Sequence, residues 1–366
     1  MKFRCERDVL DRALSVAGRA VATRGPFLQV LGGIHLHLEG DSLSVTGSDR
    51  NLTVRVTCQV GGQEDGVAVL PAKLAADIAH AFDSGQVEVV VGDAEASLSS
   101  GRSNFSLRTF TPDGFPKFEL PGGNQVTLGA SSVAAALDQV RGAASVDDSR
   151  PILTGVLLAA EDDGLRFVAT DTYRLAMRDL PGTSIMSREQ TVLVPSRALE
   201  VVERLLGDVD DLTICLGERE VVFTVGDVQI VTTLIEGEYP NYRDLIPDDY
   251  PNSLTVERDA LLDALRRVQL LAPQKDNGNV RLVMTGDGLE LIAISQDIGQ
   301  AHETVDATYD GDDLTVAFNP RYLIEGLEVC PDEEVRLETC DVGKLAVIRG
   351  VEDSDFLYLL MPVRVS

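Results

Sequence analysis

Paired carboxylates are the side chains in this sequence that could most readily do chemistry. Two adjacent acids can hold the metal ions of a phosphoryl-transfer or nuclease site. Four of the five pairs lie in predicted turns and none belongs to a convergent motif, so we interpret them as solvated loop acids. A metal-dependent phosphoryl-transfer enzyme remains the rival hypothesis. The pairs are Asp147-Asp148, Asp162-Asp163, Asp210-Asp211, Asp248-Asp249 and Asp312-Asp313.

Other candidate chemistry is equally incomplete. His35 and His37 lie on the same face of a predicted strand, but no third metal ligand is near them in the sequence. Gly32-Gly33 is not followed by the GK[ST] of a phosphate-binding loop. The five cysteines are odd in number, far apart and free of CxxC spacing, which argues against disulfides and zinc. The sequence predicts no catalytic residue, no metal and no cofactor.

The pair Ser48-Asp49 recurs as Thr170-Asp171, and this recurrence points to an internal repeat. A strand-end signature aligns Ser48, Thr170 and Ser295 at steps of 122 and 125 residues. An apolar strand, a proline and an amphipathic helix also recur, with Pro71, Pro195 and Pro320 at steps of 124 and 125. The polar pairs therefore indicate architecture rather than catalysis. The repeated segments are VAVLPAKLAADIAHAF, TVLVPSRALEVVERLL and TVAFNPRYLIEGLEVC.

Each repeat also opens with a helical pattern, in which Leu14, Leu137 and Leu265 are among the apolar positions. Between the helices the strands alternate polar and apolar residues and are separated by turns, as expected of antiparallel sheet. We predict an α+β protein of three tandem domains with two helices each. The predicted domains are 1–122, 123–250 and 251–366, joined at PGG and PDDYP.

Composition fits a folded protein but not an obvious nucleic-acid partner. The 366 residues are 44% hydrophobic, enough for a core in each of two or three domains. No apolar stretch approaches the roughly 20 residues of a membrane span, and the start is charged, so we expect a cytoplasmic protein without a membrane partner. The formal net charge of −27 predicts repulsion from nucleic acid.

The charge is unevenly distributed between the predicted elements. The six expected helices, at about 7–19, 72–82, 131–144, 196–206, 257–271 and 320–329, hold 11 basic and 11 acidic residues. Their net charge is 0, so the rest of the chain carries all of the −27. If the helices share one surface, that surface is relatively basic. The alternative is ordinary solvated helix faces with intrahelical ion pairs.

The whole chain resembles the bacterial sliding clamp, the beta subunit of the replicative DNA polymerase, and the resemblance is to members of an actinobacterial type. The resemblance implies a non-catalytic processivity factor, in which two subunits join head to tail, twelve helices line the hole and sheets form the outside. It implies as partners double-stranded DNA without sequence preference, a second copy of the chain, the polymerase alpha subunit, the clamp loader and other proteins with clamp-binding motifs. The most specific segments are SRPILTGVLLAAEDDGLRFVATDTYRLAMRDL, EGEYPNYRDLIP, VDATYDGDDLTVAFNPRYLIEGLEV and LLMPVRVS.

The resemblance also implies three sets of site residues. DNA contacts map to Arg24, Arg150 and Arg197, and more weakly to Arg141, Arg266 and Lys275. A peptide-binding groove between the second and third domains maps to Leu153, Thr170, Thr172, Arg174, Leu175, Pro240, Leu245, Leu359, Met361, Pro362, Val363 and Arg364. In it, Arg174 and Arg364 would bond polar groups of the peptide. The dimer contact maps to Lys73, Arg102 and Phe105 on one side and to Leu270, Leu271 and Glu303 on the other.

Two departures from the family pattern are visible. Asp147 and Pro151 stand where some members have basic or aromatic residues, which predicts sparser DNA contacts. Where members often carry a run of glutamates, this chain has IGQAHET, with Gln300 and His302 beside the single Glu303. We therefore predict a weaker dimer, or one sensitive to protonation of His302. A specialised second clamp, serving repair or resistance to an inhibitor, is a further hypothesis.

Overall fold

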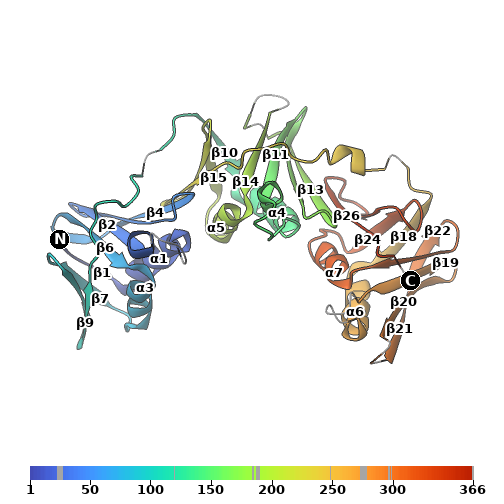
Figure 1. Ribbon diagram of the computed structural model, residues 1–366, viewed down its shortest axis with the longest axis horizontal. Helices are drawn as coiled ribbons and strands as arrows, with labels where there is room; N and C mark the ends of the chain where they lie inside the picture. The colour runs from blue at the N-terminus through green and yellow to red at the C-terminus, as the bar shows by residue number, and fades with distance from the viewer. Residues whose placement is uncertain are drawn as a thin grey trace. The chain divides into compact units, whose positions relative to one another are not determined.

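The computed structural model describes residues 1–22, 28–118, 120–183, 185–186, 190–247, 249–272, 278–295, 297 and 299–364. Within them one arrangement of strands and helices occurs three times along the chain (Figure 1). This confirms the predicted α+β class. The first repeat contains β1 (Lys2–Glu6), α1 (Arg7–Ala17), the short α2 (Leu28–Leu31), β2 (Gly33–Glu39), β3 (Ser42–Ser48), β4 (Leu52–Gln59), β5 (Gly61–Glu64), β6 (Gly66–Pro71), α3 (Ala72–Ala81), β7 (Gln86–Val91), β8 (Glu95–Ser100) and β9 (Ser103–Arg108).

The later repeats follow the same order of elements. The second contains β10 (Asn124–Gly129), α4 (Ala130–Arg141), β11 (Gly155–Glu161), β12 (Gly164–Thr170), β13 (Arg174–Pro181), β14 (Thr191–Pro195), α5 (Ser196–Leu206), β15 (Asp211–Leu216), β16 (Glu220–Val225) and β17 (Val228–Thr233). The third contains β18 (Asn252–Glu257), α6 (Arg258–Val268), β19 (Val280–Thr285), β20 (Gly288–Ser295), β21 (Gly299–Val305), β22 (Ala307–Asp310), β23 (Leu314–Phe318), α7 (Pro320–Glu328), β24 (Glu334–Thr339), β25 (Ala346–Gly350) and β26 (Phe356–Leu360).

All six predicted helices are present, and their local sequence explains where they begin. Pro320 occupies the first turn of α7, where its missing N–H costs nothing, and the Asn319 side chain accepts a hydrogen bond from the Arg321 amide at 3.0 Å. The Glu257 carboxylate caps α6 in the same way through the Asp259 and Ala260 amides. The short α2 was not predicted.

The strands form four antiparallel sheets, and two of these sheets each combine strands of two successive repeats. The eight-stranded sheet has the order β10-β15-β16-β17-β4-β3-β2-β6, and its repeats meet where β17 pairs with β4. The nine-stranded sheet has the order β14-β11-β12-β13-β26-β25-β24-β18-β22, and its repeats meet where β13 pairs with β26. The other two sheets each belong to one repeat, with orders β5-β1-β7-β8-β9 and β21-β20-β19-β23.

Because the second repeat shares its strands with both neighbours, the contacts within the chain group it into two compact units. Unit 1 comprises Met1–Ser131 and Glu200–Leu234, and unit 2 comprises Ser132–Leu199 and Ile235–Ser366. In unit 1, α1 packs against α3 and against β3 and β4 (Figure 1). In unit 2, α6 packs against α7.

Helices and sheets meet through fully buried apolar side chains. In unit 1, Leu10 and Leu14 of α1 are each 1% exposed, as their helical spacing predicts. Gly47 of β3 lies so close to the end of α1 that an added Cβ would stand 2.0 Å from the Ala17 carbonyl oxygen. Among the described residues, no helix is long and apolar enough to cross a membrane.

Candidate functional site

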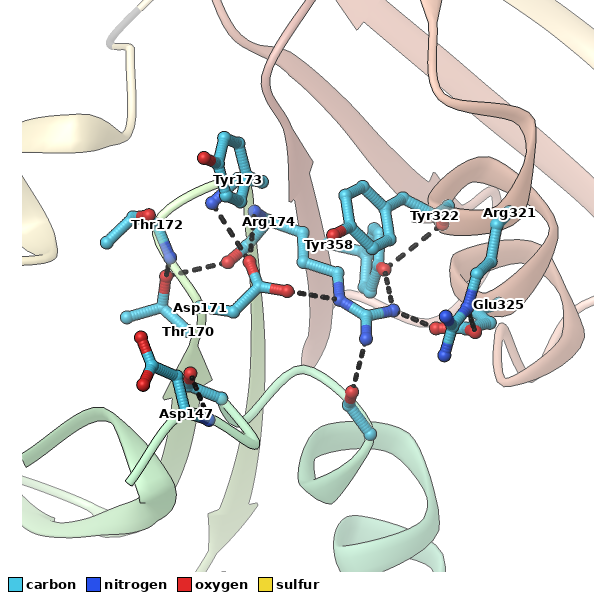
Figure 2. Close-up of polar contacts among 12 residues, drawn as sticks. Asp147, Thr170, Asp171, Thr172, Tyr173, Arg174, Arg321, Tyr322, Glu325 and Tyr358 are labelled. Carbon is cyan, nitrogen blue, oxygen red and sulfur yellow. Dashed lines mark hydrogen bonds and ion pairs between the residues drawn. The ribbon is translucent and has the colours of Figure 1, made fainter. Parts of the chain in front are cut away.

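The turn between β12 and β13 is the most tightly specified part of unit 2 (Figure 2). Thr170 Oγ1 donates to the Arg174 carbonyl at 2.6 Å and accepts from the Thr172 amide at 3.1 Å. Asp171 Oδ1 accepts from the amides of Tyr173 and Arg174 at 2.9 and 3.0 Å. These bonds hold Thr172 at a φ of 81°, a left-handed conformation that is unfavourable for a β-branched residue.

The first repeat contains the same turn between β3 and β4. Arg50 has a φ of 82°, and its amide donates to Ser48 Oγ at 3.1 Å. Asp49 Oδ1 accepts from the amides of Asn51 and Leu52 at 3.0 and 2.8 Å. Because strain and hydrogen bonds recur together, the polar pairs of the two repeats serve the same architectural purpose.

Arg174 is what distinguishes the turn in unit 2, because its guanidinium is only 7% exposed and is fully engaged within the protein. Nε donates to Asp171 Oδ2 at 3.1 Å and Nη2 donates to the Gly142 carbonyl at 2.6 Å. Nη1 donates to the Tyr358 hydroxyl at 3.2 Å and to Glu325. One side chain thus connects β13 with the end of α4, with α7 and with β26 (Figure 2).

This Arg174 network, made with Asp171, Gly142, Glu325 and Tyr358, keeps its charges. Burial alone would lower the pKa of Arg174, but Tyr358 and Glu325 raise it above its usual value. Burial would likewise raise the pKa of Glu325, yet hydrogen bonds from Arg321 and Arg174 lower it. Burial raises the pKa of Tyr358, whose neutral hydroxyl donates to the Tyr322 carbonyl at 3.1 Å.

Close packing supports the same network. An added Cβ at Gly326 of α7 would lie 2.5 Å from the Tyr358 ring, so only glycine lets α7 approach β26 this closely. The Tyr322 ring lies 4.6 Å from the Arg174 guanidinium carbon and stacks on Tyr173 with centroids 6.3 Å apart. The Arg174 side chain donates to Asp171 in the turn and to Gly142, Glu325 and Tyr358 outside it, and its predicted role in bonding a peptide stays a prediction.

The other residues expected to line a groove also gather in unit 2. Leu175 and Leu359 are paired neighbours on β13 and β26, and both are buried in one apolar cluster. The segment 235–247 packs on this cluster through Ile235, Tyr239 and Ile246. Leu153, Thr170 and Arg174 are buried as well, Pro362 and Val363 are half-buried, and the exposed members of the expected set are Thr172, Pro240, Leu245, Met361 and Arg364.

The end of the chain is fixed beside the turn by backbone hydrogen bonds. The Met361 amide donates to the Tyr173 carbonyl at 2.9 Å, and the Val363 amide donates to the Ala317 carbonyl at 2.7 Å. Met361 and Leu245 keep 51% and 43% of their surface exposed. Two apolar side chains that follow or precede buried residues of unit 2 in the sequence are thus presented to solvent.

Sequence reasoning missed several members of this region. Tyr173, 55% exposed on the turn, was left without a role. Glu325 and Tyr358 gave no local signal, because they are 151 and 184 residues from Arg174 in the sequence. Tyr239 packs against the apolar cluster, and the pairing of this aromatic residue with Pro240 could have suggested a packed linker.

The residues expected to contact DNA are differently placed. Arg24 and Lys275 lie outside the described residues. Arg150 lies beside the turn, with Nε donating to Asp147 Oδ2 at 3.3 Å and Nη1 3.5 Å from Thr172 Oγ1. The exposed Arg197 is in the first turn of α5, Arg141 is in the last turn of α4, and Arg266 of α6 donates to Glu328 at 2.8 Å.

Several helix arginines form ion pairs, as the alternative interpretation of the helix charge anticipated. Arg204 donates to Glu200 one turn earlier at 2.6 Å, and Arg321 donates to Glu325 at 2.6 Å. Arg12 makes two bonds to the Asp227 carboxylate at 2.6 and 2.8 Å. These pairs offset much of the positive charge on the helices.

His35 is packed against Phe115 with ring centroids 5.0 Å apart.

Two of the residues expected at a dimer contact, Phe105 and Glu303, lie on the edge strands β9 and β21, and the others lie on helices or turns. On unit 1, Phe105 of the edge strand β9 is 42% exposed and contacts Phe82 edge to face at 5.6 Å, while Lys73 and Arg102 are exposed. On unit 2, Leu270 is 76% exposed and Leu271 is half-buried. Glu303 of the edge strand β21 accepts two bonds from Arg267 within the same chain, at 2.7 and 3.1 Å.

Comparisons with known proteins agree along the whole chain. Models of the N-terminal, central and C-terminal domains of the DNA polymerase III beta subunit match residues 1–119, 127–241 and 243–364. Beta sliding clamps of Streptomyces coelicolor and Synechococcus elongatus are each 33% identical, with 100% of this chain and 100% and 99% of theirs covered. Equal identity to an actinobacterial and a cyanobacterial protein does not single out a lineage.

Solved structures give the same answer. The Bacillus subtilis DNA polymerase sliding clamp superimposes with a TM-score of 0.94 at 27% identity, covering 100% of both chains. Sequence, fold and three family models therefore coincide. The chain belongs to the DNA polymerase III beta subunit family, the beta sliding clamps, and is a non-catalytic processivity factor of DNA replication.

Proposed function

We propose that two copies of this chain close head to tail into a ring around double-stranded DNA and that unit 2 tethers the polymerase to that ring. The observation that carries the proposal is the pattern of sheet edges. Within the chain, the last strand of one repeat pairs with a strand of the repeat before it. The last strand of the second repeat, β17, pairs with β4, and the last strand of the third repeat, β26, pairs with β13. By the same rule β9 and β21 should each have a further partner, but within the described part of the chain both are edge strands.

The internal repeat predicts the register of the missing pair. The strand β4 corresponds to β13 at a step of 122 residues and to β21 at a further 125, and β9 corresponds to β17 at a step of 125. The observed pair Val56 and Val228 then maps to Glu303 and Ser103. The junction between β13 and β26 leads to the same alignment of β21 with β9. The predicted pairs include Gly299 with Leu107, Gln300 with Ser106, Ala301 with Phe105 and His302 with Asn104.

Side-chain exposure supports this assignment. Phe105 corresponds to Ile230 in the second repeat at the step of 125 residues, and Ile230 corresponds to Tyr358 in the third repeat at a step of 128 residues. Ile230 is 0% exposed and Tyr358 is 2% exposed at their junctions, whereas Phe105 is 42% exposed at the unpaired edge. Covering Phe105, together with Leu270 and Leu271, would remove apolar surface from water and stabilise the closed contact.

DNA is proposed to be held by enclosure, with only a few phosphate contacts. Such contacts carry no sequence information and weaken with salt, which suits a clamp that slides. Arg150 and Arg197, both exposed, are the main candidates among the described residues. Arg141 and Arg266 are weaker candidates, and Arg150 would first have to leave Asp147. Arg24 and Lys275 stay predictions from the resemblance.

Partner proteins are proposed to carry a short apolar motif that binds next to segment 235–247 and the apolar cluster on which it packs. Leu245 and Met361 would contact hydrophobic anchors, and Arg364 would bond polar groups at the rim. The expected partners are the polymerase alpha subunit, the clamp loader and other proteins with clamp-binding motifs, acting in the cytoplasm. A specialised clamp would share these features, and a second clamp gene in the same genome would separate the two roles.

A cysteine cross-link tests the proposed closure. The double variant Asn104→Cys with His302→Cys places thiols directly opposite one another across the predicted contact, where Cβ atoms are about 4.5–5.5 Å apart. Mild oxidation should give a covalent dimer on a non-reducing gel. The matched control, Asn104→Cys with Gln300→Cys, is out of register by two residues and should stay monomeric on the gel. Equal cross-linking of both variants, or none in either, would contradict the register and the closure.

A further inference from the structure

The one carboxylate on the free edge of β21 is already neutralised inside its own chain. Glu303 accepts from Arg267 Nε and Nη2 at 2.7 and 3.1 Å, the two-pronged geometry that is strongest for an arginine and a carboxylate. The hydrogen bond from Arg267 also lowers the pKa of Glu303, so the carboxylate stays charged and paired. Arg267 is on α6, which packs directly against β21.

The rest of the contact strands carries little charge. On β21 the residues before Glu303 are Gly299, Gln300, Ala301 and His302. The His302 ring lies 2.9 Å from Glu290 Oε1 on the neighbouring strand, so it too has a partner in its own chain. On β9 the residues that face β21, Ser103 to Leu107, are all uncharged, and the exposed Arg108 at the end of β9 lies beyond Gly299 in the predicted register. The predicted register therefore places uncharged residues against uncharged residues along the strand pair.

Cations stand beside this edge on the opposite side of the proposed contact. Lys73 and Arg102 are exposed on unit 1 and would approach Glu303 of the second copy. A cation that meets an arginine–glutamate pair gains attraction to Glu303 but is repelled by Arg267, so the two effects largely cancel. Asp263 of α6 also forms an ion pair within its own chain, with Arg266 at 3.7 Å.

We propose that the second copy is held at this edge by apolar burial and backbone hydrogen bonds rather than by ion pairs, because Arg267 masks Glu303. This inference rests on the proposed ring closure and specifies what kind of contact closes it. Phe105 and Leu270 supply the apolar surface, with 42% and 76% of their side chains available to be covered. Apolar burial does not weaken as sodium chloride rises, whereas exposed ion pairs do.

The test is the salt dependence of the dimer dissociation constant, measured by sedimentation of the full chain at 50 and 500 mM sodium chloride. The wild-type constant should change by less than about threefold over this range. Arg267→Ala frees Glu303 for Lys73 and Arg102 of the second copy, so this variant should dimerise more tightly than wild type at low salt and lose that advantage at high salt. Glu303→Gln leaves the Arg267 charge uncompensated opposite Lys73 and Arg102, so this variant should dimerise less tightly than wild type at low salt and approach wild type at high salt.

Arg204→Ala is the matched control, because Arg204 is also an exposed helix arginine bonded to a glutamate but is not on either edge. It should behave as wild type at both salt concentrations. A wild-type dimer that weakens tenfold or more at high salt, with the loss removed by Glu303→Gln, would overturn the masking role of Arg267 and leave the ring intact. Absence of any dimer at either salt would overturn the ring closure itself.

Discussion

Removal of the Arg174 side chain is the perturbation whose effect follows most directly from the structure. In Arg174→Ala the buried carboxylate of Asp171 loses its bond at 3.1 Å, and the Gly142 carbonyl loses its bond at 2.6 Å. Glu325 keeps its hydrogen bond from Arg321 at 2.6 Å and therefore loses only one of its two arginine partners. The turn that holds Thr172 at a φ of 81° loses its attachment to α4, α7 and β26.

The expected cost can be estimated from the burial of the partners. Deleting one member of a buried ion pair costs about 3–5 kcal/mol, because the other charge is left unpaired. Asp171 is 13% exposed and Glu325 is 32% exposed, so we expect the lower end, about 3 kcal/mol. In a unit of about 200 residues this corresponds to a decrease in melting temperature of roughly 6–12 °C.

Hydrogen exchange during thermal unfolding of the full chain would locate the loss. Peptides covering 165–180 in unit 2 should become unprotected at a lower temperature, whereas peptides covering 86–108 in unit 1 should not change. Arg321→Ala removes an exposed partner of the same Glu325 and should cost only about 0.3–0.5 kcal/mol. A shift for Arg174→Ala as small as that for Arg321→Ala, or an equal shift in both units, would refute the reasoning.

Three further predictions concern other parts of the chain. Burial lowers the pKa of His35 to about 4, whereas its ordinary pKa is 6.5, so below pH 6.5 the unfolded chain binds more protons than the folded chain. The free energy of unfolding should therefore fall by about 1 kcal/mol between pH 7.5 and 5.5. Urea titration of His35→Phe should show a smaller fall. Met361→Glu places a charge among the apolar groups of unit 2 and should weaken binding of a clamp-motif peptide about tenfold or more by calorimetry, with the fold unchanged; wild-type affinity would exclude Met361 from the site. Phe105→Ala should weaken the dimer by about 2 kcal/mol in sedimentation, and an unchanged dimer would place the contact elsewhere.

The repeated elements could be predicted because each depends on local sequence. The prolines at Pro71, Pro195 and Pro320 mark the starts of three helices, and apolar residues such as Leu14 and Leu137 recur at helical spacing on buried faces. Alternating strands between turn signals predicted the antiparallel sheets. The short α2 has too few residues to produce a recognisable period.

The Arg174 network could not be predicted, because its members come from distant parts of the chain. Nothing near Tyr358 in the sequence indicates that an arginine 184 residues earlier will contact its hydroxyl. The same is true of Arg267 and Glu303, which are 36 residues apart and meet only because α6 packs on β21. The division into two units also depends on strand pairing between repeats, which a repeat of single domains does not reveal.

Retention on DNA of different topology tests the central claim most directly. The protein would be loaded by a clamp loader onto nicked circular DNA, half of the sample would be linearised with a restriction enzyme, and both halves would be resolved by gel filtration. A closed sliding ring predicts that protein stays with the circles and is lost from the linear ends. Equal retention on both substrates would contradict enclosure and show that the chain binds DNA by ordinary surface contacts.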